Sequence, residues 1–165
     1  MSLGRWLRNH PRLLERVYQV FAHVFQWAEP LIARLGYSRA DRWLRWPERL
    51  VKQIIFDCRM CGQCILRSTG MTCPMTCPKQ LRNGACGGVR ADGGCEVEPA
   101  VRCIWVEAFE RARRLEIYGL EIETVQRPVN GQLEGTSAWI NTLEGRDKEA
   151  PRIWSLQPTV IRRDA

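Results

Sequence analysis

Apolar side chains recur every three or four residues through the N-terminal third of the chain, a period that predicts α-helix. The first long helix is expected to begin at Pro11, because proline suits the first helical turn. Pro30 is expected to kink or divide this helix, and Gly36 to end it. Two shorter helices are predicted after it, one from Ser38 and one from near Pro47. The predicted core-facing stripe of the first helix is Leu14, Val17, Phe21, Val24, Phe25, Ala28 and Leu31.

The periodicity stops at residue 58, where a segment rich in glycine and proline begins. Residues 58–103 contain no long apolar run, so hydrophobic burial alone cannot hold this stretch together. All eight cysteines of the chain lie within it. Metal ligation by cysteine is therefore the interaction expected to order the segment.

The C-terminal third is predicted to start with a helix and to continue as an extended arm. A helical stripe runs from Val101 to Ala112, with Pro99 near its start. Beyond Gly119 the chain has scattered turn formers and isolated apolar anchors, namely Trp139, Ile140, Ile153 and Trp154. The expected fold class is mostly α with an irregular cysteine-rich metal-binding centre and an extended C-terminal arm. The expected units are a helical region at 1–57, a cysteine-rich module at 58–103, and a helix plus arm at 104–165.

Four tryptophans make the N-terminal helices unusually rich in indole: Trp6, Trp27, Trp43 and Trp46. The favoured interpretation is that the rings pack the helices onto the cysteine module. Docking of a partner protein is the next interpretation, which would make 1–57 a docking region. Contact with a membrane surface is the third, and it is not expected.

Charge and composition restrict the class of protein further. The chain of 165 residues has a formal net charge of +7 and a pI near 9.2. No dense basic stripe is interleaved with stacking aromatic residues, so nucleic-acid binding is not expected. Arginines interrupt the N-terminus, which does not resemble a signal peptide, and no apolar run reaches the roughly 18 residues that cross a bilayer. A cytoplasmic location follows, where thiols stay reduced and clustered cysteines favour metal over disulfides.

The spacing of the cysteines favours iron–sulfur chemistry. The run Cys58-x-x-Cys61-x-x-Cys64, followed by Cys-Pro pairs at Cys73 and Cys77, is typical of ligands to a four-iron cluster. Eight thiolates equal the requirement of two four-cysteine sites, so two [4Fe-4S] clusters are predicted. The candidate metal ligands are Cys58, Cys61, Cys64, Cys73, Cys77, Cys86, Cys95 and Cys103.

Zinc is the competing interpretation of the same cysteines. The two histidines, His10 and His23, lie far upstream, so every ligand would be sulfur. A tetrahedral zinc fits the first cysteine run poorly, because Cys61 would belong to two knuckles at once. One [4Fe-4S] cluster plus zinc, or zinc only, remain as alternatives.

A provisional grouping joins the first three cysteines to Cys103 and leaves Cys73, Cys77, Cys86 and Cys95 as the second site. The basic side chains expected to offset the negative charge of a cluster are Arg59, Lys79 and Arg82.

The cysteine run also carries a resemblance. CRMCGQCIL at 58–66 and TGMTCPMTCPKQLRNGACGG at 69–88 resemble the cysteine-rich methylenetetrahydrofolate reductase C-terminal domain family, as do LEG at 133–135 and SAWIN at 137–141. That domain occurs behind, or as a small subunit beside, a flavin-containing reductase barrel. The resemblance covers roughly residues 50–145.

The resemblance implies an accessory electron-transfer subunit with no catalytic residues of its own. Its partner would be a barrel-type methylenetetrahydrofolate reductase subunit that holds FAD or FMN and the folate. The clusters would pass electrons between that flavin and a donor such as ferredoxin. The alternative function is a structural subunit with cysteine-only zinc that stabilises a folate-linked reductase or methyltransferase.

Overall fold

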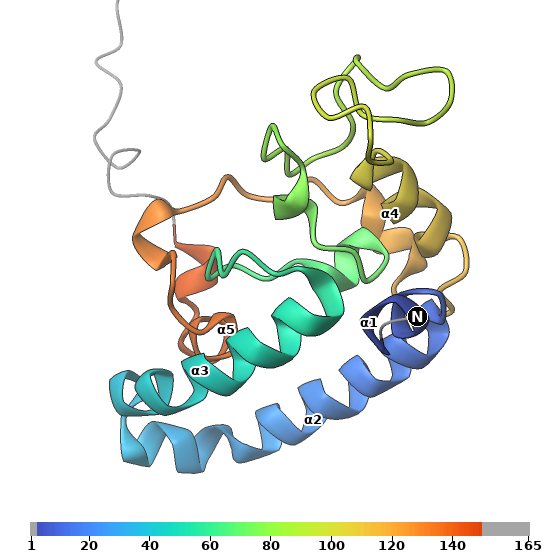
Figure 1. Ribbon diagram of the computed structural model, residues 1–165. Helices are drawn as coiled ribbons and strands as arrows, with labels where there is room; N and C mark the ends of the chain where they lie inside the picture. The colour runs from blue at the N-terminus through green and yellow to red at the C-terminus, as the bar shows by residue number, and fades with distance from the viewer. Residues whose placement is uncertain (1–2, 150–165) are drawn as a thin grey trace, which may run out of the picture.

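The computed structural model describes residues 3–149 and is mostly α-helical (Figure 1). Its α-helices are α1 (Leu3–Arg8), α2 (Pro11–Leu35), α3 (Tyr37–Phe56), α4 (Ile104–Ala112) and α5 (Ala138–Glu144). Short 3-10 turns are η1 (Leu66–Thr69), η2 (Pro74–Thr76), η3 (Gly119–Glu123), η4 (Gly131–Leu133) and η5 (Arg146–Lys148). Within the described residues there is no β-strand, only two isolated β-bridges. The predicted fold class, mostly helical around an irregular cysteine-rich centre, is confirmed.

Helices α2 and α3 form a long antiparallel hairpin along one side of the molecule (Figure 1). Pro30 and Pro47 both lie inside these helices, so neither proline divides its helix as the sequence suggested. The two short helices predicted after Gly36 are instead the single helix α3. Proline disfavours a helix interior by about 3 kcal/mol, a cost that packing along a 25-residue and a 20-residue helix outweighs.

The hairpin is joined to the rest of the chain by a buried carboxylate. Glu15 of α2 is 1% exposed and accepts hydrogen bonds from the backbone N–H groups of Glu116, Ile117 and Tyr118, at 2.8–2.9 Å. Burial raises the pKa of Glu15, but these N–H donors and the nearby Arg12 outweigh it, and the pKa lies below its usual range. The carboxylate therefore ties α2 to the turn that follows α4.

The predicted C-terminal arm contains one short helix, α5. Ser137 caps α5 by accepting the N–H of Ile140, whose side chain is 1% exposed. Trp139 stacks on α2, with ring centroids 4.5 Å from Phe21 and 5.4 Å from Phe25. The predicted anchors Trp139 and Ile140 thus contribute to packing. The other two, Ile153 and Trp154, lie outside the described residues.

The first tryptophan interpretation is wrong. Trp27, Trp43 and Trp46 are 84%, 80% and 71% exposed, so they do not pack the helices onto the cysteine module. Several positions of the predicted core stripe, among them Val17 and Val24, are also more than half exposed. Leu14 of that stripe is buried as predicted, together with Pro11, Glu15 and Ile32. No described helix combines the length and the apolarity needed to cross a membrane.

Candidate metal centre

The eight cysteines gather in two groups of four around two separate cavities. Cys58, Cys61, Cys64 and Cys73 line a small enclosed cavity of about 20 Å³ between the end of α3 and the turns η1 and η2. Cys77, Cys86, Cys95 and Cys103 line a larger one of about 340 Å³. We call these the inner and the outer cysteine group. The provisional grouping is therefore corrected at two places, because Cys73 lies with the inner group and Cys103 with the outer.

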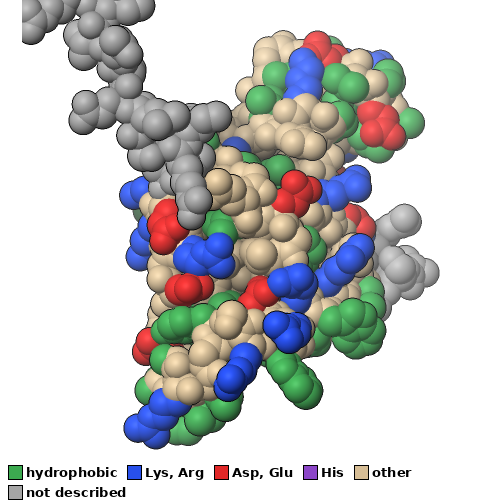
Figure 2. Space-filling model, turned by 90° about the vertical axis from the view of Figure 1, so that its left-hand side faces the viewer, with side chains coloured by type: hydrophobic (Ala, Val, Ile, Leu, Met, Phe, Trp, Pro, Cys, Tyr) green, Lys and Arg blue, Asp and Glu red, His purple; other side chains and the backbone are tan. Residues whose placement is uncertain are grey.

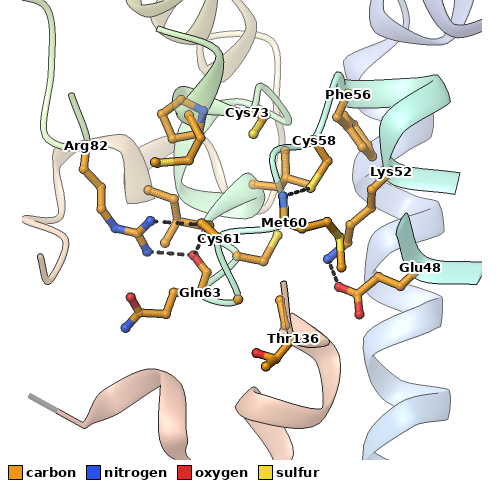
Figure 3. Close-up of a pocket in the computed structure, with 17 residues that line it drawn as sticks. Glu48, Lys52, Phe56, Cys58, Met60, Cys61, Gln63, Cys73, Arg82 and Thr136 are labelled. Atoms are coloured by element: carbon orange, nitrogen blue, oxygen red, sulfur yellow. Dashed lines mark hydrogen bonds and ion pairs between the residues drawn. The ribbon is translucent and has the colours of Figure 1, made fainter. Parts of the chain in front are cut away.

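Backbone turns in the left-handed conformation place the first cysteines of the inner group around their cavity. Asp57 ends α3 in the left-handed conformation, and Met60 follows with a φ of 51°. This turn lets the backbone N–H of Met60 donate to Cys58 Sγ at 3.3 Å (Figure 3). Gly62 continues the turn with a φ of 73°, and a Cβ there would lie 2.1 Å from the carbonyl oxygen of Leu133. Only glycine fits between Cys61 and this part of the chain.

Antiparallel backbone pairing places Cys95 and Cys103, the last two cysteines of the outer group. The backbone N–H of Cys103 donates to the carbonyl of Gly93 at 2.9 Å, and Cys95 pairs with Val89 in a β-bridge. These contacts bring Cys95 and Cys103 to one cavity although seven residues separate them. The turn explains why Cys103 joins the outer group, and the sequence gives little sign of it.

A hydrogen bond between Cys58 and Cys73 shifts the pKa values of these two inner thiols in opposite directions. The hydrogen bond with Cys73 and the backbone N–H of Met60 together lower the pKa of Cys58 to about 6, against the effect of burial. The same hydrogen bond and burial raise the pKa of Cys73, and burial raises that of Cys64. Cys58 is therefore the thiol of this group most ready to ligate as a thiolate.

A buried ion pair from α3 forms one wall of the inner cavity (Figure 3). Lys52 and Glu48 are 4% and 0% exposed, with Nζ 2.5 Å from Oε1. Glu48 also accepts the hydroxyl of Ser137 at 2.5 Å, and Lys52 Nζ lies 5.0 Å from the centre of the Trp139 ring. Burial lowers the pKa of Lys52, but the thiols of Cys64 and Cys58 and the Glu48 carboxylate raise it by more. Lys52 therefore stays a cation beside the inner thiols.

A second buried cation stands on the opposite wall. Arg82 is 8% exposed and donates to the carbonyl of Gln63 at 2.7 Å, with Nη1 4.0 Å from Cys61 Sγ. Its Nε–H is buried and has no hydrogen-bond partner among the described residues. Two buried cations therefore line a cavity that also carries four thiols, and one of them has an N–H without a partner within residues 3–149. Such surroundings favour an anionic group in the cavity.

Four thiols are the ligand set of a [4Fe-4S] cluster and equally of a cysteine-only zinc site. The only histidines of the sequence are absent from both cavity linings, and each cavity has four thiols. Within residues 3–149, no three cysteine, histidine or carboxylate side chains are arranged to hold a single metal ion.

The two groups are close to each other. Cys73 and Cys77 stand at the two ends of η2, so their Cα atoms are at most about 14 Å apart. Cys61 and Cys77 moreover line a common surface hollow.

Of the three basic residues singled out in the sequence, the structure places only Arg82 inside. Arg59 is exposed, and Lys79 is half exposed and pairs with Glu96, which also accepts from the Cys86 thiol at 3.6 Å. Sequence reasoning missed Glu48 and Lys52. Their four-residue spacing was visible, but the neighbouring Leu50, Val51 and Ile54 suggested that the other face of α3 is the buried one.

Helices around an irregular module with two four-cysteine groups define a helical, cysteine-rich domain. A family model described as methylene-tetrahydrofolate reductase C terminal matches residues 37–132, more than half of the chain. The chain therefore belongs to this family. The match takes in all of α3, earlier than the resemblance suggested, and ends before the SAWIN segment. Neither the comparison with curated proteins nor that with solved structures finds a match.

Proposed function

We propose that this chain is the iron–sulfur accessory subunit of a flavin-dependent methylenetetrahydrofolate reductase complex and carries electrons to or from the partner's flavin. The observation that supports this most is the division of eight cysteines into two neighbouring groups of four, each lining its own cavity. Membership of the reductase C-terminal family supplies the reaction.

Each group of cysteines would hold one [4Fe-4S] cluster through its four thiolates. A bound cluster would supply one-electron storage. The protein's own residues set the surroundings. Lys52 and Arg82 provide buried positive charge at the inner group, and Met60 donates its N–H to a ligand sulfur. The outer group lies in the larger cavity, where a donor such as ferredoxin can approach it.

The carbon chemistry belongs to the partner in this proposal. The partner is a barrel-type reductase subunit that binds FAD or FMN together with the folate. The inner and outer groups lie on either side of η2, so a single electron can pass from the outer cluster to the inner one and on to the flavin, or in reverse. In this sequence of transfers, the cluster of the inner group would lie between the electron donor and the flavin.

Anaerobic stopped-flow mixing tests this function. The chain, reduced by dithionite and freed of excess reductant, is mixed with the oxidised reductase subunit of the same cell. The expected result is bleaching of the flavin absorbance, one electron for each cluster oxidised. A Cys58→Ser variant is the control and is expected to slow the bleaching. An unchanged flavin spectrum, or zinc as the only metal in the chain, refutes the electron-transfer function and favours the structural zinc alternative.

A further inference from the structure

An exposed apolar stripe runs along the outer side of α2. Seven side chains repeat at intervals of three or four residues, and each is between 42% and 84% exposed. They are Leu13, Val17, Val20, Val24, Trp27, Leu31 and Leu35. At 1.5 Å per residue the stripe is about 33 Å long. Intervals of three and four residues are the pattern of a seam between two packed helices.

Helix α3 adds a second exposed apolar series, formed by Trp43, Trp46, Leu50 and Ile54, which are 45–80% exposed. Single exposed apolar residues are ordinary on a protein surface, but a continuous series on two neighbouring helices is not. The opposite side of each helix is already packed on the module, so the apolar surface of α2 is about half covered by its own chain. Among the described residues, nothing covers the outer stripe of α2.

Exposed arginines border these stripes. All four carboxylates of α2 and α3 are engaged within the chain: Glu15 with backbone N–H groups, Glu29 with Tyr37, Asp41 with Arg45 and Ser137, and Glu48 with Lys52. By contrast Arg34, Arg39, Arg42 and Arg49 are exposed and form no ion pair among the described residues. Figure 2 shows basic and hydrophobic side chains intermingled over the lower part of the molecule, towards the turn between α2 and α3.

These charges decide between possible occupants. A second copy of the chain would bring no unengaged carboxylate of α2 or α3 to pair with these arginines, which disfavours self-association. A helix that lies on a membrane surface carries Lys or Arg along its polar face. The middle of the polar face of α2 instead holds uncharged Gln19, His23 and Gln26. A protein surface with an apolar helix or groove and an acidic rim fits both the helix-packing interval and the arginines.

We infer that the α2–α3 hairpin is the surface by which this chain docks onto its reductase subunit, through an apolar helical seam bordered by carboxylates of the partner. The inference rests on the proposed function for the identity of the partner. The seam buries the stripe of α2 and the tryptophans of α3, and the arginines at the hairpin turn pair with the partner's acidic rim. The cysteine groups take no part in the contact, so docking and cluster binding are separable.

Affinity measurements with purified proteins test the inference. The probe is the reductase subunit of the same cell, titrated against the holo chain by calorimetry. Trp27→Asp, and separately Val20→Asp, is expected to weaken binding by about tenfold or more, because a charge then enters an apolar seam. Leu120→Asp is the matched control, since Leu120 is 83% exposed but lies outside the hairpin. Its affinity is expected to match that of the wild type. Iron content and helical circular dichroism show that each variant is folded.

The outcomes separate the inference from the proposed function. Equal binding by the wild type and Trp27→Asp overturns the hairpin as the docking surface and leaves the reductase partnership standing. No binding by the wild type overturns both. Flotation with phosphatidylglycerol vesicles that Trp27→Asp abolishes, or dimerisation that it abolishes, assigns the stripe to a membrane or to a second copy and overturns the inference.

Discussion

Replacing Lys52 by methionine is expected to destabilise the fold strongly. The change removes the ammonium group 2.5 Å from Glu48, and the carboxylate, 0% exposed, keeps only the hydroxyl of Ser137. Removal of one partner of a buried ion pair costs about 3–5 kcal/mol, because the other charge is left without compensation. At about 2–4 °C per kcal/mol for a chain of this size, the melting temperature should fall by about 6–20 °C.

The double variant Lys52→Met/Glu48→Gln separates the lost charge from the lost packing. With both charges gone, its free energy of unfolding should lie within about 1–2 kcal/mol of the wild type. Urea denaturation of the anaerobic protein, read by circular dichroism, measures both variants. The exposed pair of Arg146 with Glu144, 3.8 Å apart, gives the control, and Arg146→Met should cost less than about 1 kcal/mol. A single variant as stable as the wild type refutes the assignment of a charged, buried pair.

The same substitution should lower the reduction potential of the inner cluster. A cation stabilises the added electron, and a unit charge at about 5–10 Å with an effective dielectric constant of 20 contributes about 1.7–3.3 kcal/mol. For one electron this corresponds to about 70–140 mV, taking 59 mV for each tenfold change. The double variant should shift less, since Glu48 opposes Lys52. Redox titration followed by electron paramagnetic resonance measures both. An inner potential unaffected by Lys52→Met contradicts the role of this charge.

Three further changes test other parts of the account. Glu15→Gln should lose about 1–3 kcal/mol of stability at pH 7. The folded pKa of Glu15 is depressed, so the carboxylate stabilises above the ordinary pKa, and the advantage should vanish as urea midpoints are followed down through acidic pH. Cys73→Ser and Cys103→Ser should each halve the iron content and abolish different resonance signals, whereas loss of the same signal contradicts the inner and outer groups. Gly62→Ala should lower the melting temperature, because its Cβ meets a carbonyl oxygen at 2.1 Å, and Gly131→Ala, with open space, should not.

The helical class of the fold and the cysteine cluster could be predicted from the sequence, because periodicity and spacing are local properties. The boundary at which α3 ends, one residue before Asp57, is likewise marked by the loss of periodicity. The continuity of α2 and α3 through Pro30 and Pro47 was not predictable. It depends on packing over the whole helix length, which outweighs the local preference of proline.

Which face of each long helix is buried also could not be predicted from the pattern of apolar residues. Apolar positions usually mark the buried face, yet Leu50 and Ile54 of α3 are 45% and 54% exposed. The buried face carries Glu48 and Lys52 instead, since they compensate each other and stand beside the thiols. Apolar residues left outside and charges placed inside are both expected where a surface is shared with a partner and a site carries charge.

The division of the cysteines could not be obtained from spacing. Cys73 and Cys77 are nearly equivalent in sequence, each followed by proline. They are separated by the short turn η2. Cys73 before it lines the inner cavity, and Cys77 after it lines the outer cavity. Cys103 is brought to the outer group by backbone pairing with Gly93. Such non-local backbone contacts leave no periodic trace in a sequence.

The central claim is that both cysteine groups hold iron–sulfur clusters, and Mössbauer spectroscopy tests it most directly. The chain is produced with iron-57, purified without oxygen, and analysed for iron, acid-labile sulfide and zinc. The account predicts about eight irons and eight sulfides per chain, with spectra of two [4Fe-4S] clusters that dithionite reduces. Zinc bound by the cysteines, with no cluster spectrum before or after reduction, contradicts it.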